Sequence, residues 1–191
     1  MLRVAGLGGA VAVALRSGGP ARAASDVPQT DAELVYDLLQ TEQVMAFAYE
    51  QLLSTGVIAP GSAQMLTHFS GHEQQHVRAW TGALRQLGAG APVAPVSVDA
   101  ADAALKQLHV AARLADAGTE RRAIELLIGA EEANIGAYYT AIAKLHDPQL
   151  LQTAAQAMGA DSQHAMALRR ILHPRPVDRF VPNAFVQGSH R

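Results

Sequence analysis

The stretch GHEQQHVRAW, residues 71–80, places Glu73 and His76 three positions apart among apolar residues that recur every three to four positions. That period is typical of one face of an α-helix, and such a face normally packs into a core. An acid or an imidazole on this face needs a partner, because burying an uncompensated charge is costly. The stretch therefore indicates a helix whose inward face carries chemistry.

Four long stretches of the chain have this helical period, and their ends carry capping signals. Thr30-x-x-Glu33 is a capping-box pattern, Gly56 and Gly88 are typical of the residue after a helix end, and Pro148 suits the first turn of a helix. The expected helices span residues 31–55, 62–87, 119–145 and 148–172.

The connections between these helices predict the architecture. Short loops join the helices within each pair, whereas a Pro/Ala/Gly-rich segment, 89–98, separates the pairs and leads into a short extra helix expected to end at Gly118. No useful length of sequence alternates between apolar and polar residues. The sequence predicts an all-α four-helix bundle over 31–172, built of two antiparallel hairpins joined by a long crossover.

The two ends of the chain read differently from the bundle. Residues 1–23 combine a basic residue, a short apolar run and a small-x-small motif, which predicts a cleaved secretory signal of twin-arginine-like character. The apolar run is too short to span a bilayer, so we expect no stable membrane anchor and an exported protein, in the periplasm, cell envelope or outside. Residues 173–191 are expected to form an extended tail, with Phe180 and Phe185 against the bundle.

Composition excludes several classes of function. The 191 residues carry a net charge of −2, which gives no electrostatic footprint for a nucleic acid. There is no cysteine, so disulfides, thiolate metal sites and a cysteine nucleophile are excluded. Any metal would be held by His, Asp and Glu.

Each of the four expected helices carries an ionisable interruption on its apolar stripe. The first and third helices have a single glutamate, and the second and fourth have an acid-x-x-His pair. The six residues are Glu42, Glu73, His76, Glu131, Asp161 and His164.

These residues repeat between the two halves of the chain. Tyr49 follows Glu42 by seven positions, and Tyr138 follows Glu131 by seven. The midpoints between each glutamate and its acid-x-x-His pair fall at about residues 58 and 147, inside the two predicted turns. Because antiparallel residues equidistant from a turn lie at equal height, all six groups are expected in one layer.

Four buried carboxylates call for compensating charge, which two divalent cations would supply. Carboxylate and imidazole ligands suit iron, manganese or zinc. A satisfied polar core layer without metal stays open as the alternative. Tyr49 and Tyr138 are either core residues or donors to the metal ligands. His72 and Glu132, beside the stripes, are expected on the solvated face, and Trp80 in the core.

The order of these motifs resembles the ferritin-like superfamily of di-metal carboxylate bundles, and the phrases HEQQHVRAW and AEEANIGAYY are similar to exported bacterial ferritin-like domain proteins. The resemblance covers 31–172 and implies that the six residues are metal ligands, with Glu73 and Asp161 as bridges. The family usually has Glu where this chain has Asp161, which is one methylene shorter.

The resemblance implies a di-iron or di-manganese centre, with zinc less favoured, that oxidises Fe²⁺ or handles O₂ or H₂O₂. A homo-oligomer is compatible with the sequence. Two alternatives stay open: a non-catalytic structural or stress-associated envelope protein with a weak or absent metal site, and an interaction module without metal.

Overall fold

The computed structural model describes residues 29–181, 186 and 188, and the described residues form helices and no strand. The expected signal segment, Phe185 and His190 lie outside the described residues. The long helices are α1 (Asp31–Ser54), α2 (Pro60–Gln86), α4 (Glu120–Ile142) and α5 (Pro148–Leu172); the shorter elements are α3 (Val98–Gln107) and the 3₁₀ turns η1 (Leu114–Asp116) and η2 (Val177–Arg179).

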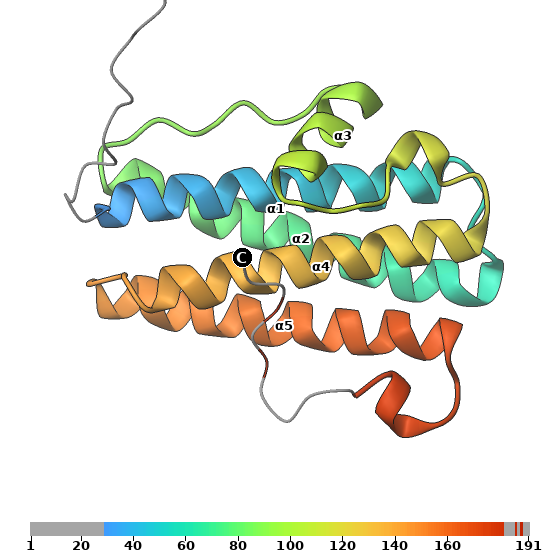
Figure 1. Ribbon diagram of the computed structural model, residues 1–191. Helices are drawn as coiled ribbons and strands as arrows, with labels where there is room; N and C mark the ends of the chain where they lie inside the picture. The colour runs from blue at the N-terminus through green and yellow to red at the C-terminus, as the bar shows by residue number, and fades with distance from the viewer. Residues whose placement is uncertain (1–28, 182–185, 187, 189–191) are drawn as a thin grey trace, which may run out of the picture.

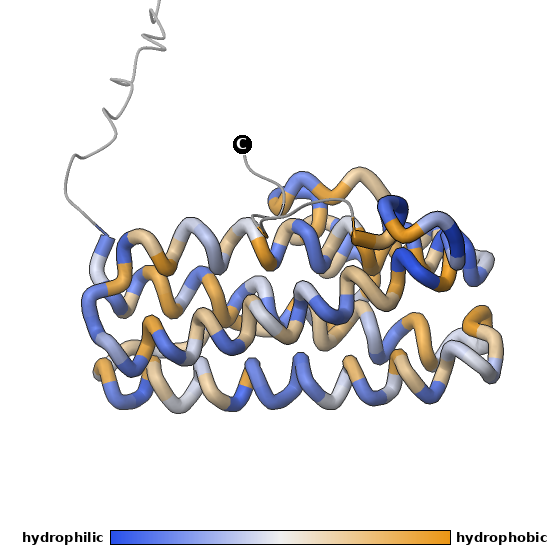
Figure 2. Tube along the Cα trace, turned by 90° about the horizontal axis from the view of Figure 1, so that it is seen from below, coloured by the Kyte–Doolittle hydropathy of each residue, from blue (hydrophilic) through white to orange (hydrophobic). Residues whose placement is uncertain are grey.

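The all-α prediction is confirmed: α1 packs against α2 and α4 against α5, and the two hairpins lie side by side as a bundle (Figure 1). The crossover from α2 to α4 runs along the outside of α1, where α3 packs. Apolar and polar residues are interspersed along all four long helices (Figure 2), as expected for amphipathic helices whose apolar residues recur every three to four positions. Among the described helices, none combines the length and apolar character needed to cross a bilayer.

Local hydrogen bonds set the helix starts. The predicted capping box is present at α1, where the Thr30 hydroxyl accepts from the Glu33 amide and the Glu33 carboxylate accepts from the Thr30 amide. Asp147 caps α5 ahead of Pro148, and its carboxylate accepts from the backbone amides of Gln149 and Leu150. The second helix begins at Pro60, two residues earlier than predicted, because proline needs no partner for its nitrogen in the first turn.

The extra helix is shorter than predicted. It ends at Gln107 instead of Gly118, and His109 then takes a left-handed backbone conformation, with φ of 63°. The buried Asp102 carboxylate accepts hydrogen bonds from the backbone amides of Leu114 (2.6 Å) and Ala115 (3.3 Å). These bonds fold the chain back onto α3, so the helical pattern after Gln107 becomes a loop and a 3₁₀ turn.

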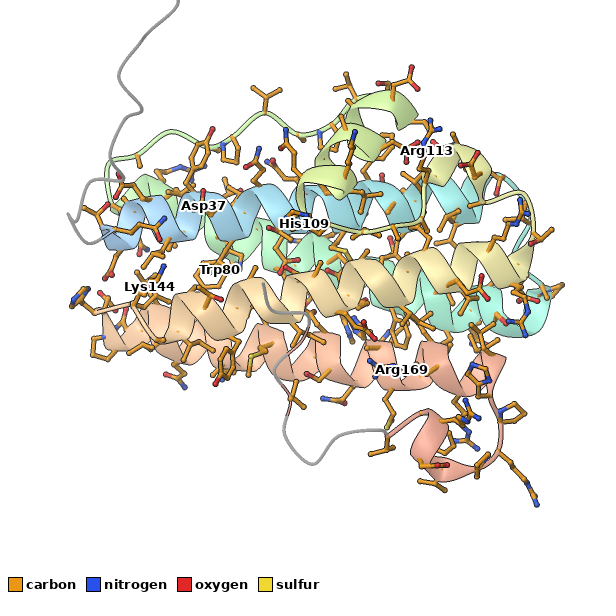
Figure 3. All side chains as sticks on the ribbon, in the orientation of Figure 1. Asp37, Trp80, His109, Arg113, Lys144 and Arg169 are labelled. Atoms are coloured by element: carbon orange, nitrogen blue, oxygen red, sulfur yellow. The ribbon has the colours of Figure 1, made fainter. Side chains whose placement is uncertain are left out.

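Two apolar clusters fill the bundle, one on each side of the ionisable layer. The first contains Met45 and Leu66, and the second contains Leu38 and Trp80, which is fully buried as predicted (Figure 3). The clusters seal the layer above and below. The tail, expected to be extended, contains one 3₁₀ turn at Val177–Arg179 and a half-buried Phe180.

Candidate metal centre

The structure brings all six predicted ligand residues together in one layer between the apolar clusters. One comes from α1, two from α2, one from α4 and two from α5. The four carboxylates are fully buried, and the two imidazoles differ, because 14% of the His76 side chain is exposed against 2% of His164. The layer is therefore closed on the His164 side and slightly open at His76.

The six residues form two groups whose potential ligand atoms lie within 4.8 Å of one another. One group is Glu42, Glu73 and His76; the other is Glu73, Glu131, Asp161 and His164.

Glu73 belongs to both groups and gives a separate oxygen to each. Its Oε2 lies 3.8 Å from His76 Nδ1, and its Oε1 lies 3.1 Å from His164 Nδ1. Glu42 Oε2 is 3.4 Å from His76 Nδ1, and Glu131 Oε1 is 3.2 Å from His164 Nδ1. Each imidazole thus presents Nδ1 to the carboxylates.

Asp161 lies between the two imidazoles but has only one oxygen to offer. Its Oδ1 is 3.6 Å from His76 Nδ1 and 4.0 Å from His164 Nδ1. Its Oδ2 accepts a hydrogen bond of 2.9 Å from Asn134 Nδ2. The same Asn134 nitrogen donates to Glu42 Oε1 at 3.2 Å, so one amide ties α1, α4 and α5 together.

Sequence reasoning missed Asn134. It stands three residues after Glu131, which places it on the same helix face one turn on. The residue in the corresponding position of the first hairpin is Met45. Comparing the two hairpins would have offered a signal, because the hairpin that has Asp161 in place of a glutamate also has Asn134 in place of a methionine.

The two tyrosines link the hairpins crosswise. Tyr49 on α1 donates to Glu131 Oε1 of α4 at 2.5 Å, and Tyr138 on α4 donates to Glu42 Oε1 of α1. Trp80 Nε1 in turn donates to the Tyr138 hydroxyl oxygen at 2.6 Å. Both tyrosines are fully buried, so each hydroxyl holds one glutamate of the opposite hairpin in place.

The hydrogen bonds leave a consistent set of buried ligand atoms without a hydrogen-bond partner among the described residues. Glu42, Glu131 and Asp161 each have one oxygen bonded to the protein and one without a partner, whereas Glu73 has two without a partner. Leaving buried polar atoms unsatisfied is costly, and a bound cation would satisfy atoms of this kind. The atoms are Glu42 Oε2, Glu73 Oε1 and Oε2, His76 Nδ1, Glu131 Oε2 and Asp161 Oδ1.

Burial and the neighbouring charges compete in the electrostatics of the layer, and at Glu42 the contact with His76 outweighs burial and lowers the pKa. Desolvation, followed by the nearby Glu131 and Glu42 charges, raises the pKa of Glu73 to about 7, and burial also raises the pKa of Asp161 well above its usual value. Burial alone would lower the histidine values, but the carboxylates outweigh it and raise the pKa of His76 to about 10 and of His164 to about 9.

The flanking residues differ from their predictions in part. His72 is half-buried, and its Nδ1 lies 2.9 Å from His164 Nε2, so it contacts the layer instead of lying on the solvated face. Glu132 points outward and pairs with Arg169 of α5. His109 and His146, for which the sequence indicates surface positions, are exposed.

Comparison with known proteins agrees with the fold. A family model described as a ferritin-like domain matches residues 30–174. The crystal structure of a conserved hypothetical protein, rv2844, from Mycobacterium tuberculosis superposes with a TM-score of 0.64 over 76% of this chain and 92% of that chain. At 16% sequence identity this likeness concerns the fold alone. No curated protein matches the chain.

Proposed function

Because the chain belongs to the family of ferritin-like domains, we propose that its buried layer binds two divalent cations of iron or manganese and serves in the oxidation of Fe²⁺ or the turnover of O₂ or H₂O₂. The observation that carries the proposal is that six of the eight buried side-chain nitrogen and oxygen atoms without a hydrogen-bond partner among the described residues belong to the two groups. The other two are Gln43 Oε1 and Asn134 Oδ1. Bound cations would give the six atoms their partners.

Charge supports two cations. Four buried carboxylates carry four negative charges when ionised, and two divalent cations balance them. A single divalent ion would leave two negative charges buried in the same layer. Nitrogen and oxygen donors with no sulfur suit manganese and iron, with zinc as the competitor.

The hydrogen bonds assign different roles to the acids. Glu73 would bridge the two cations, since its Oε2 faces the His76 group and its Oε1 faces the His164 group. Glu42 and Glu131 would each bind through the single oxygen that the tyrosines leave free. Asp161, which the resemblance also implies as a bridge, would bind through Oδ1, since its Oδ2 accepts from Asn134.

The surrounding residues would hold the layer ready for the cations. Tyr49, Tyr138 and Asn134 fix three carboxylates by their second oxygens, and such supporting bonds commonly strengthen metal binding by 10- to 100-fold, as an order of magnitude. When bound, the cations supply the redox equivalents for the reaction. The partial exposure of His76 gives small molecules such as O₂ or H₂O₂ a way to the first group.

The test is to load the purified protein separately with Fe²⁺ and Mn²⁺, count bound ions per chain, and follow Fe²⁺ oxidation and H₂O₂ decay. About two ions per chain with turnover, both lost in Glu73→Gln, are expected. Bound metal without turnover would favour the non-catalytic alternative. No bound metal in the wild type would contradict the proposal and leave a structural bundle.

We also propose that the protein is exported, on the strength of the signal-like composition of residues 1–23. Mass spectrometry of the chain recovered from a native-type host is expected to find a mature N-terminus at Ala24. An intact N-terminus on protein recovered from the cytosol would contradict export.

A further inference from the structure

Three histidines form a continuous series from the surface of α2 to the buried layer. His68 is exposed, His72 is half-buried and His164 is buried. The His68 and His72 ring centroids lie 4.3 Å apart, and those of His72 and His164 lie 5.2 Å apart with nearly parallel planes. His72 Nδ1 is 2.9 Å from His164 Nε2, while His164 Nδ1 faces the carboxylates.

We propose that His68 and His72 form a two-histidine capture site for first-row divalent cations, from which ions reach the buried layer past His164. Residues four apart on a helix share a face, so the two imidazoles can bind one ion together. Imidazole nitrogen suits Zn²⁺, Ni²⁺, Co²⁺ and Fe²⁺. The capture site stands on the two histidines alone, whereas delivery rests on the proposed function.

The repeat shows that the fold does not need these histidines. Positions 68 and 72 lie five and one residues before Glu73, and the positions five and one residues before Asp161 hold Gln156 and Ala160. The second hairpin therefore positions its acid-x-x-His pair without any imidazole at the matching sites. Only the first hairpin carries histidines at these positions, and there His72 contacts His164 of the opposite hairpin.

The contact between His72 and His164 connects the capture site to the buried layer. An ion held by His68 and His72 is one imidazole away from the carboxylates, and a captured ion meets the layer at a far higher effective concentration than an ion in solution. His72 also supports the His164 ring, so changing it would disturb the layer itself. The His68 ring contacts that of His72. Among the described residues, His68 has no ring contact or hydrogen bond with the six layer residues. A substitution at His68 therefore tests the capture site without disturbing the layer directly.

Delivery is tested by stopped-flow loading of the metal-free protein with micromolar Co²⁺, followed by absorbance. His68→Gln is expected to slow loading by about tenfold or more while the final metal content stays unchanged. His68→Asp keeps a ligand atom at this position and is expected to restore much of the rate. His146→Gln, an exposed histidine paired with Asp31 at the end of the bundle, is the matched control and is expected to load normally. Equal rates for His68→Gln and the wild type would overturn delivery.

The capture site is tested separately in Glu73→Gln, which removes the carboxylate shared by both groups. Calorimetry with Ni²⁺ is expected to find one ion per chain, lost when His68→Gln is added. Absence of Ni²⁺ binding in a folded Glu73→Gln protein would overturn the capture site. If the wild type itself binds Ni²⁺ at the pair while its layer takes up no metal, the capture site is sustained and both delivery and the proposed function are contradicted, so the two failures are distinguishable.

Discussion

The two hairpins of the bundle carry the same pattern but surround the layer differently. In α1 and α2 the pattern is Glu42, Met45, Glu73 and His76; in α4 and α5 the corresponding residues are Glu131, Asn134, Asp161 and His164. The first hairpin supplies the longer bridging acid, and its histidine is partly exposed. The second supplies a shorter acid tied down by an amide, and its histidine is closed off.

This difference teaches that the repeat fixes the scaffold while single residues make the two groups of potential ligands unequal. The second group has four potential ligands and the first has three, with Glu73 counted in both. We expect a tightly held ion in the group that contains His164, which is buried, and a more weakly held ion in the group that contains His76, which is partly exposed. Fewer protein ligands and some solvent access are the features of a position that keeps room for a substrate.

The largest predicted effect separates Glu73 from Asp161. Glu73→Gln is expected to reduce bound metal from about two ions per chain to nearly none, since it replaces one of the two oxygens by an amide nitrogen and removes the negative charge that both groups share, whereas Asp161→Asn is expected to keep at least one ion. Elemental analysis after gel filtration measures both. Glu125→Gln, an exposed acid on α4 paired with Arg121, is the control. Equal metal loss in the two variants would break the comparison.

The next effect separates the two tyrosines. Tyr49→Phe and Tyr138→Phe each remove a donor to a buried glutamate, but Tyr138→Phe also leaves the buried Trp80 N–H without its acceptor. An unsatisfied buried polar group costs about 1–3 kcal/mol, so Tyr138→Phe is expected to lower the free energy of unfolding by about that much more.

Urea denaturation of the metal-free proteins measures this difference. Adding Trp80→Phe to each tyrosine variant provides the control, because the extra cost of Tyr138→Phe is expected to shrink once the indole N–H is gone. A Tyr49→Phe variant less stable than Tyr138→Phe would contradict the assignment.

A smaller effect is predicted for the amide of the second hairpin. Asn134→Met copies the first hairpin at this position and frees Asp161 Oδ2. The shorter acid then loses its tether, and metal affinity of the layer is expected to fall by about tenfold, the lower end of supporting-bond effects. Competition with a chelator measures the affinity, and Met45→Leu serves as the matched change. An unchanged affinity would show that Asn134 serves packing alone.

The smallest predicted effect is the pH dependence of the metal-free protein. Imidazole pKa values raised from 6.5 to about 10 in His76 and about 9 in His164 mean that their stabilising contribution is complete below pH 6.5 and is lost as pH rises through those values. The raised pKa of Glu73, about 7, works in the same direction up to that pH.

The chelated protein is therefore expected to melt at a temperature several degrees lower at pH 9.5 than at pH 6. Scanning calorimetry checks this. Mn²⁺ is expected to reduce the decline, because bound cations replace the protons. A melting temperature of the chelated protein that rises between these pH values would contradict the account.

The sequence predicted the bundle and the layer well because both follow from periodicity. Acid and imidazole on apolar stripes, together with equal distances from the turns, placed Glu42, Glu131 and the two acid-x-x-His pairs at one height, where the structure has them. The sequence did not determine the hydrogen bonds from each tyrosine to the glutamate of the opposite hairpin, since a buried tyrosine hydroxyl has several partners within reach. They depend on how the hairpins face each other, which periodicity along one chain does not determine.

Other features depended on contacts between distant segments. Asn134 and His72 gain their roles from Asp161 and His164, which lie 27 and 92 residues away along the chain, and neither residue type stands out on a helix face. The early end of α3 depends on Asp102 capturing the amides of Leu114 and Ala115. A local pattern carries no information on such tertiary bonds.

Anomalous X-ray diffraction from crystals grown with Mn²⁺ or Fe²⁺ tests the central claim most directly, because it locates each ion and identifies the element. Two peaks are expected in the layer, one beside His76 and one beside His164, with Glu73 between them and the His164 peak more fully occupied. An empty layer in metal-saturated crystals, or two ions bridged by Asp161 and not by Glu73, would contradict the account.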